Sequence, residues 1–354
     1  MGGYFLRQTL GRAVWILGAL SLALVAAEIA ARWTWFGTHE TAPTALGLYV
    51  DQWQAEKAAE ARVDGDARQQ LQRRAFDASF RDRGLDLPPV GPRQGYEGER
   101  LLPQRRPCGD LAACESALDL PLLWNLDEAG RQRVGPVDGE VRLLILGDEA
   151  ALAPFASTLD ETYFAVLQEH LAADGPSPSI HVQARRGQSL DQAVDGMILS
   201  GIDLEPQAVV LLLDPVRDLP AGALGEGAVA ELLRRQRASV RRAARFGRAA
   251  GLDVAFALSP DLGAKISRSA VEEELWDLLG SAARSRLRQR LRDEMQRVAE
   301  EEGAHFWDYG SLLAGTRGTD FVDLSDVSDR GQEALGRALA DDLRPILDPE
   351  TGSE

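Results

Sequence analysis

Apolar runs alternate with amphipathic stretches along the C-terminal two thirds of the chain. Five short runs bounded by turn residues have the composition of buried strands; they cover residues 141–147, 180–184, 208–214, 253–259 and 305–309. Apolar positions recur at helical spacing between and after these runs, over residues 161–173, 190–200, 227–250, 271–302 and 329–347. This alternation predicts an α/β fold: a three-layer αβα sandwich with a mostly parallel, five-stranded sheet.

Ligands of such folds bind beyond the carboxyl ends of the strands. We therefore expect any functional site among the residues that directly follow the predicted strands. These are Asp148 and Glu149, the segment Arg185, Arg186 and Gly187, then Asp214, Ser259, and the loop with Asp323 and Asp326.

The N-terminal part has a different pattern. Residues 13–31 are apolar except for Glu28, and about 20 such residues are needed to cross a bilayer as a helix. Arg7 and Arg12 precede the run, which places the N-terminus in the cytoplasm and the rest outside. We predict a single-pass signal anchor over residues 1–36, in the inner or cytoplasmic membrane, with a periplasmic C-terminal domain. A cleaved signal peptide is the alternative.

Two segments separate this anchor from the predicted domain at residues 121–354. Residues 37–85 carry apolar positions at helical spacing and are predicted to form a juxtamembrane helical stalk or a solvated spacer. Residues 86–120 are rich in Pro and Gly and are predicted to be loop. This loop holds Cys108 and Cys114, which outside the cytoplasm are expected to form a disulfide, with two free thiols as the alternative.

Charge narrows the choice of partners. Lys and Arg number 39 against 55 Asp and Glu, a net charge of −16. A chain this acidic is a poor nucleic-acid binder. Seven arginines nevertheless crowd the predicted helix 227–250, either as a solvated face or as a contact for an acidic partner. No Gly-rich phosphate or dinucleotide motif is present, and we predict no cofactor.

Several short blocks resemble the SGNH/GDSL hydrolases, in particular their membrane-anchored members. Residues 143–149 resemble the block in which the nucleophilic Ser follows Gly-Asp, and residues 184–189 resemble the block whose Gly, here Gly187, lends an N–H to the oxyanion hole. Residues 323–331 have the spacing of the last block, with an Asp at position 323 and a Gly at position 331. The resemblance implies an SGNH-like, flavodoxin-like sandwich and a site at Asp148, Glu149, Gly187, Asp323 and Asp326.

The chain departs from that family at the reacting groups. Glu149 stands at the nucleophile position and Asp326 at the position of the base His, and the block after residue 213 has no Asn. Acyl transfer needs an activated nucleophile, a base and oxyanion donors, and an anionic Glu149 would oppose the developing oxyanion. The four histidines, His39, His170, His181 and His305, are not placed to substitute.

Three roles for the acids stay open at this point. In the first, they are structural groups of an inactive site, with Asp148 and Glu149 at a helix N-terminus. In the second, they bind a divalent cation, with Glu149, Asp214 and Asp326 as candidate ligands. In the third, they work as an acid–base pair on a sugar. Three arginines expected near the same rim, Arg185, Arg186 and Arg217, would either neutralise these acids or hold an anionic glycan.

We therefore predict a membrane-anchored, extracytoplasmic SGNH-like pseudoenzyme that serves as a scaffold or accessory subunit of a membrane or cell-envelope complex. Its expected partners are the membrane, through residues 13–31, other envelope proteins and a polysaccharide. The alternatives are an active esterase, acyltransferase or carboxylate-dependent enzyme on envelope polysaccharide, and a glycan-binding module.

Overall fold

The computed structural model describes the polypeptide in seven ranges, which are residues 65–84, 131–136, 142–173, 177–185, 187–216, 226–280 and 282–347. The predicted anchor, the loop 86–120 and its cysteine pair lie outside these ranges. Of the helices within them, none has the length and apolar character that a bilayer span requires.

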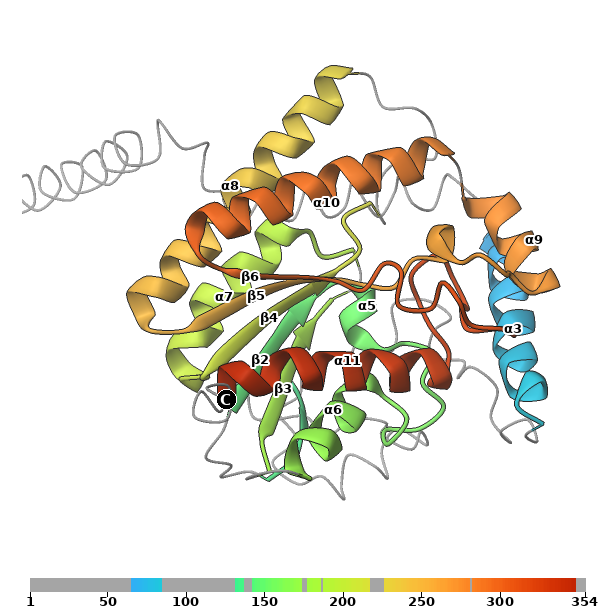
Figure 1. Ribbon diagram of the computed structural model, residues 1–354, viewed down its shortest axis with the longest axis horizontal. Coiled ribbons are helices and arrows are strands. Elements are labelled where there is room, and N and C mark those ends of the chain that lie inside the picture. Colours follow the sequence, from blue (N-terminus) through green and yellow to red (C-terminus); the bar gives the residue numbers. More distant parts are fainter. Residues whose placement is uncertain are drawn as a thin grey trace, which may run out of the picture. The chain divides into compact units, whose positions relative to one another are not determined.

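A six-stranded mixed sheet forms the centre of the fold (Figure 1). Its strands are β1 (Gln132–Val134), β2 (Arg142–Gly147), β3 (Ser179–Ala184), β4 (Ala208–Leu213), β5 (Asp253–Leu258) and β6 (His305–Asp308), in the order β1-β3-β2-β4-β5-β6. Strands β2 to β6 are parallel and confirm the five predicted strands. The prediction of five strands in all was wrong, because β1 adds an antiparallel edge to β3. Its three residues are too short to give a periodic signal.

The helices fall where helical spacing predicts them. They are α6 (Tyr163–Ala172), α7 (Leu190–Leu204), α8 (Glu226–Ala250), α9 (Ala270–Leu279), α10 (Ala282–Glu302) and α11 (Asp329–Leu347), with a short α5 (Glu149–Leu152) after β2. The expected single helical region 271–302 is two helices. Gly280 ends α9, and a Cβ there would lie 2.3 Å from the Trp276 ring, so no larger residue fits this close packing.

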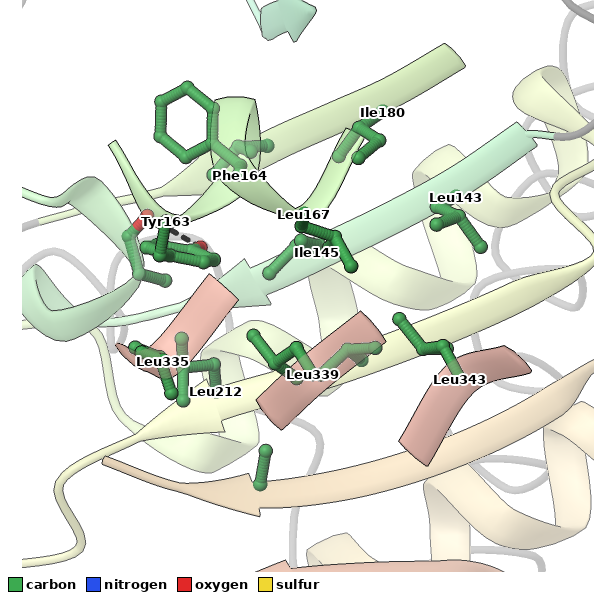
Figure 2. Packing of buried hydrophobic residues seen from close by; sticks show 14 of the residues in the cluster. Leu143, Ile145, Tyr163, Phe164, Leu167, Ile180, Leu212, Leu335, Leu339 and Leu343 are labelled. Carbon is green, nitrogen blue, oxygen red and sulfur yellow. Dashed lines mark hydrogen bonds between the residues drawn. The ribbon is translucent and has the colours of Figure 1, made fainter. Parts of the chain in front are cut away.

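The strands pack helices on both faces because their side chains alternate between them. In β2, Leu143 and Ile145 face the cluster that also includes residues of α6 and α11 (Figure 2), whereas Leu144 and Leu146 face residues of α7, α8 and α10. The two apolar layers are the covering that the three-layer prediction requires.

A third apolar cluster lies apart from these two layers and includes residues of helix α3 (Gly65–Asp82). Phe76 and Phe80 of α3 are buried with Val271 and Leu275 of α9 and Phe321. Helix α3 falls within the predicted stalk segment, and its apolar face packs on the α/β domain beside α9 (Figure 1).

Candidate functional site

The sheet has a topological switch point between β2 and β4, because the chain passes from β2 to β3 on one side and then returns from β3 to β4 on the other side of β2. Open α/β sheets bind ligands at the carboxyl ends of strands at this point. Asp148 follows β2 and Asp214 follows β4, so the sheet brings these two acids together. One carboxylate oxygen of Asp148 accepts a 2.9 Å hydrogen bond from the Asp214 amide.

Asp148 is a structural group in this arrangement. It is buried, caps the N-terminus of α5, and accepts a second 2.9 Å bond from the Ala150 amide. Gly147 before it packs against β4 so closely that a Cβ would lie 1.7 Å from the Leu212 carbonyl oxygen. Glu149, at the nucleophile position, is half-buried as the first residue of α5.

Three arginines of α10, spaced four residues apart, reach the carboxyl ends of successive strands. Arg284 and Arg288 each lie 2.5 Å from a carboxylate oxygen of Asp214, after β4. Arg288 also donates a 2.5 Å bond to the Ser259 carbonyl after β5, and Arg292 lies 2.5 Å from Asp308 at the end of β6. Because these arginines are spaced by four residues, their side chains lie on one face of α10. Their ion pairs with the acids cover this edge of the sheet.

Burial and ion pairing have opposite effects on the pKa of Arg288 in this row. Burial alone would lower the pKa of Arg288, but the nearby carboxylates of Asp214, Asp261 and Asp308 outweigh it and hold the pKa above the ordinary value. Burial raises the pKa of Asp261, which lies 3.4 Å from Arg288, although that guanidinium acts in the opposite direction. Arg288 is therefore a permanently charged group whose counterions are these acids.

Gly187 adopts the left-handed backbone conformation. Its φ is +65°, and a Cβ there would have no heavy atom within 4 Å. Glycine is favoured at this position for backbone conformation, not for lack of space. Arg185 before it is exposed and donates its amide to the Gly147 carbonyl, which ties the turn to the end of β2.

Asp323 and Asp326 are both buried in the loop before α11. Asp323 accepts bonds from Arg68 of α3, from Gln72 Nε2 at 2.8 Å and from the Leu324 amide at 2.7 Å. Gly331, the last residue of the block 323–331, packs closely against Val327. A Cβ at position 331 would lie 2.4 Å from the Val327 side chain. Asp323, the acid that the sequence resemblance predicts to orient a base, therefore contacts α3.

A fully buried ion cluster fixes the same loop. Lys265 Nζ lies 2.8 Å from Glu272 and 2.7 Å from Asp320, and all three side chains have no exposed surface. Glu272 in turn accepts bonds from the amides of Asp320 and Phe321, at 2.9 and 3.0 Å. Arg330 pairs with Asp320 from α11. This cluster ties α9 to the loop and to the first turn of α11.

The placement of Arg186 and Arg217 near the acids stays a prediction, because both lie outside the described residues. Sequence reasoning missed Arg284 and Arg288 of α10, which bind Asp214, and Arg68 of α3, which binds Asp323. A spacing of four among Arg284, Arg288 and Arg292 was the available signal. Lys265, isolated in an arginine-rich chain, was a weaker one.

The metal hypothesis finds no geometric support in the described residues. Among them no group of three or more His, Cys, Asp or Glu side chains is arranged to hold an ion, so Glu149, Asp214 and Asp326 do not form a ligand set. Of the histidines that are described, His181 is buried in β3 with Nε2 3.0 Å from Ser179 Oγ, His170 is on α6, and His305 begins β6.

The arginine-rich helix α8 pairs within the domain. Arg237 lies 2.5 Å from Glu294 of α10, and Arg245 lies 2.8 Å from Glu302 at the end of the same helix. Arg242 lies 2.9 Å from both Asp191 and Asp195 of α7. These pairs favour the interpretation of a charged helix face over that of a contact for an acidic partner.

A second group of acids, near the N-terminus of α11, makes stability sensitive to pH. Burial raises the pKa of Glu161, and the charge of Asp329 raises it further. Burial also raises the pKa of Asp329, although its carboxylate accepts two 2.8 Å bonds from Ser157. A raised pKa means that the folded state holds its proton to higher pH than the unfolded chain does.

We expect Glu161→Gln to be more stable than the wild type at neutral pH, by an amount that vanishes in acid. Below about pH 4.3, the pKa of a glutamate in the unfolded chain, residue 161 is uncharged in both the wild type and the variant. As pH rises, the unfolded wild type ionises first, and the wild type loses stability until the folded pKa is passed. Thermal unfolding from pH 4 to 8 measures this difference, with the exposed Asp277→Asn of α9 as control. A difference that shrinks as pH rises would contradict the assignment.

Comparison with known proteins finds fold neighbours only. No protein-family profile and no curated sequence matches the chain. Among solved structures it is similar to TesA, at 18% identity and a TM-score of 0.42 over 58% of this chain and 99% of that one. It is also similar to an aryl esterase of M. smegmatis, at 15% identity and a TM-score of 0.44 over 59% of this chain and 100% of that one. A third is a catalytic mutant of an acetylxylan esterase from Geobacillus stearothermophilus, at 16% identity and a TM-score of 0.44 over 59% and 95%.

Proposed function

We propose that this chain is an SGNH-like protein without hydrolase activity that serves as an accessory or scaffold subunit of a membrane or cell-envelope complex. In this proposal residues 13–31 anchor it in the cytoplasmic membrane and the α/β domain lies on the extracytoplasmic side. Strand order and the placement of Gly147, Asp148, Gly187 and Gly331 support the SGNH-like assignment. The alternating α/β pattern and the sequence blocks support it independently.

One observation carries the loss of activity. The acid that would orient the catalytic base, Asp323, accepts hydrogen bonds from Arg68 and Gln72, while Glu149 and Asp326 take the positions of the nucleophile and the base. Acyl transfer by this fold depends on a nucleophile, an imidazole and its orienting carboxylate acting as one unit. A carboxylate pair cannot reproduce that proton transfer, and Glu149 adds negative charge where an oxyanion would develop.

The remaining acids favour a structural role over acid–base chemistry on a glycan. Asp214 is held by two guanidinium groups, and Asp148 by two backbone amides. An acid–base pair needs one carboxyl with a raised pKa near the reacting bond and room for the substrate. The row of arginines from α10 lies at the edge of the sheet where such a substrate would bind.

If the chain is a subunit, it should form a stable complex with other proteins of the membrane or envelope. We expect the full-length chain, purified from its native membrane in a mild detergent, to elute in a complex with defined envelope proteins at constant stoichiometry. Elution of the wild-type chain alone would contradict the subunit role.

A further inference from the structure

Two exposed arginines of α10 take no part in the ion pairs that hold this helix to the domain. Arg286 and Arg290 are spaced by four residues, and neither side chain forms an ion pair or hydrogen bond with the part of the chain that the structure describes. Every other arginine of α8 and α10 pairs with a carboxylate. The acid nearest in sequence, Asp293, contacts Gln289 and Arg292 instead. Because like charges one turn apart destabilise a helix, this basic pair is a cost that no contact among the described residues offsets.

Helix α9 carries the opposite charges at the same spacing. Glu273 and Asp277 are exposed and separated by four residues, so they lie on one side of the helix. The Asp277 side chain has no ion pair or hydrogen bond among the described residues, and the Glu273 carboxylate pairs with Arg268 at 3.4 Å. The acidic pair of α9 therefore complements the basic pair of α10 in both sign and spacing.

An exposed leucine lies between the two pairs in the sequence. Leu278, in the last turn of α9, is 41% exposed, and α10 begins at Ala282. The two helices adjoin at one end of the domain (Figure 1). We define the α9–α10 corner as the exposed residues Glu273, Asp277, Leu278, Arg286 and Arg290. An apolar side chain flanked by charges of both signs is the composition of a small protein interface, with an apolar centre and a polar rim.

We propose that the α9–α10 corner binds the same corner of a second copy of this chain. A two-fold contact sets the basic pair of each copy against the acidic pair of the other, and such a contact closes as a dimer. The net charge of −16 opposes contact between copies in general, whereas the two positive and two negative charges of the corner cancel. A second copy is therefore a partner whose complementary charges are present in the chain itself. The inference concerns contact between copies and does not depend on the proposed role in an envelope complex.

Sedimentation equilibrium of the full-length chain in a mild detergent at low salt tests the dimer. We expect a monomer–dimer equilibrium that weakens as salt is added, because exposed ion pairs are screened. Arg286→Glu combined with Arg290→Glu should lower the association constant at least about tenfold. Glu273→Arg combined with Asp277→Arg should have the same effect. An equimolar mixture of these two double variants should associate again, because both contacts of the mixed dimer then join opposite charges.

A matched control separates the corner from the net charge of the chain. Arg73→Glu combined with Arg317→Glu changes the net charge by the same amount at exposed positions outside the corner, and should leave association close to that of the wild type. Leu278→Ser should weaken association with little change in its salt dependence. Equal weakening by the control, or a mixture that does not recover, would overturn the proposal.

The wild-type result separates a second copy from another partner. A wild-type chain that stays monomeric at low salt would overturn the proposal. If that monomer keeps a complex from its native membrane that Arg286→Glu combined with Arg290→Glu loses, the basic pair binds an acidic partner protein in place of a second copy.

Discussion

Lys265→Met should lower the free energy of unfolding by about 3–5 kcal/mol, the range found when one partner of a buried ion pair is removed. Lys265 lies between Glu272 and Asp320, and none of the three side chains has exposed surface. Methionine replaces the apolar stem of the lysine side chain but removes the cation that Glu272 and Asp320 share, and only Asp320 keeps a second cation, Arg330. Domains of this kind have only about 5–15 kcal/mol of stability in total, so the loss is large.

The effect should be specific to the buried lysine. Arg317→Met removes an exposed cation from the same loop and should change stability little. Urea unfolding followed by circular dichroism measures both variants. Replacing Glu272 and Asp320 by their amides in the Lys265→Met background should recover part of the loss, because no unpaired buried charge then remains. A Lys265→Met protein as stable as the Arg317→Met control would contradict the ion cluster.

Arg288→Met should lower the free energy of unfolding by about 3–5 kcal/mol for the same physical reason. Arg288 bonds to Asp214 and to the Ser259 carbonyl at 2.5 Å each, and it compensates the buried Asp261. Arg284 still binds Asp214 in this variant, so Asp261 and the Ser259 carbonyl lose the most.

The chain offers a close control for this variant. Arg290 lies on the same helix two residues further on and is exposed, so Arg290→Met makes the same chemical change without unpairing a buried acid. Chemical unfolding at neutral pH should separate the two variants clearly. Equal stability of Arg288→Met and Arg290→Met would show that the row contributes no net stability to this edge of the sheet.

The fold could be predicted well from the sequence because its strands are continuous apolar runs. The run at residues 208–213 is buried at every position, which is typical of a central parallel strand. Strand β1 gave no such signal, since it has three residues and only Val134 is buried. The break between α9 and α10 depends on the packing of Gly280 against Trp276, which helical spacing alone does not reveal.

The site was predicted less completely, and the reason is distance along the chain. Asp148 and Gly187 lie in short blocks directly after β2 and β3, so their places beyond the strand ends followed from the pattern. Asp323 lies in the loop between β6 and α11. The groups that bind the acids come from elsewhere: Arg68 is 255 positions from Asp323, and Arg288 is 74 positions from Asp214. Such pairings become visible only when the helices are packed on the sheet.

Turnover of an acyl ester by the purified chain tests the central claim most directly. Release of p-nitrophenol from its acetate should be the same for the wild type, for Glu149→Gln and for heat-denatured protein. That result is expected from the proposed function, in which Glu149 and Asp326 take the positions of the nucleophile and the base and Asp323 is bound by α3. Enzymatic turnover by the wild type that Glu149→Gln abolishes, in a variant that remains folded, would contradict the account.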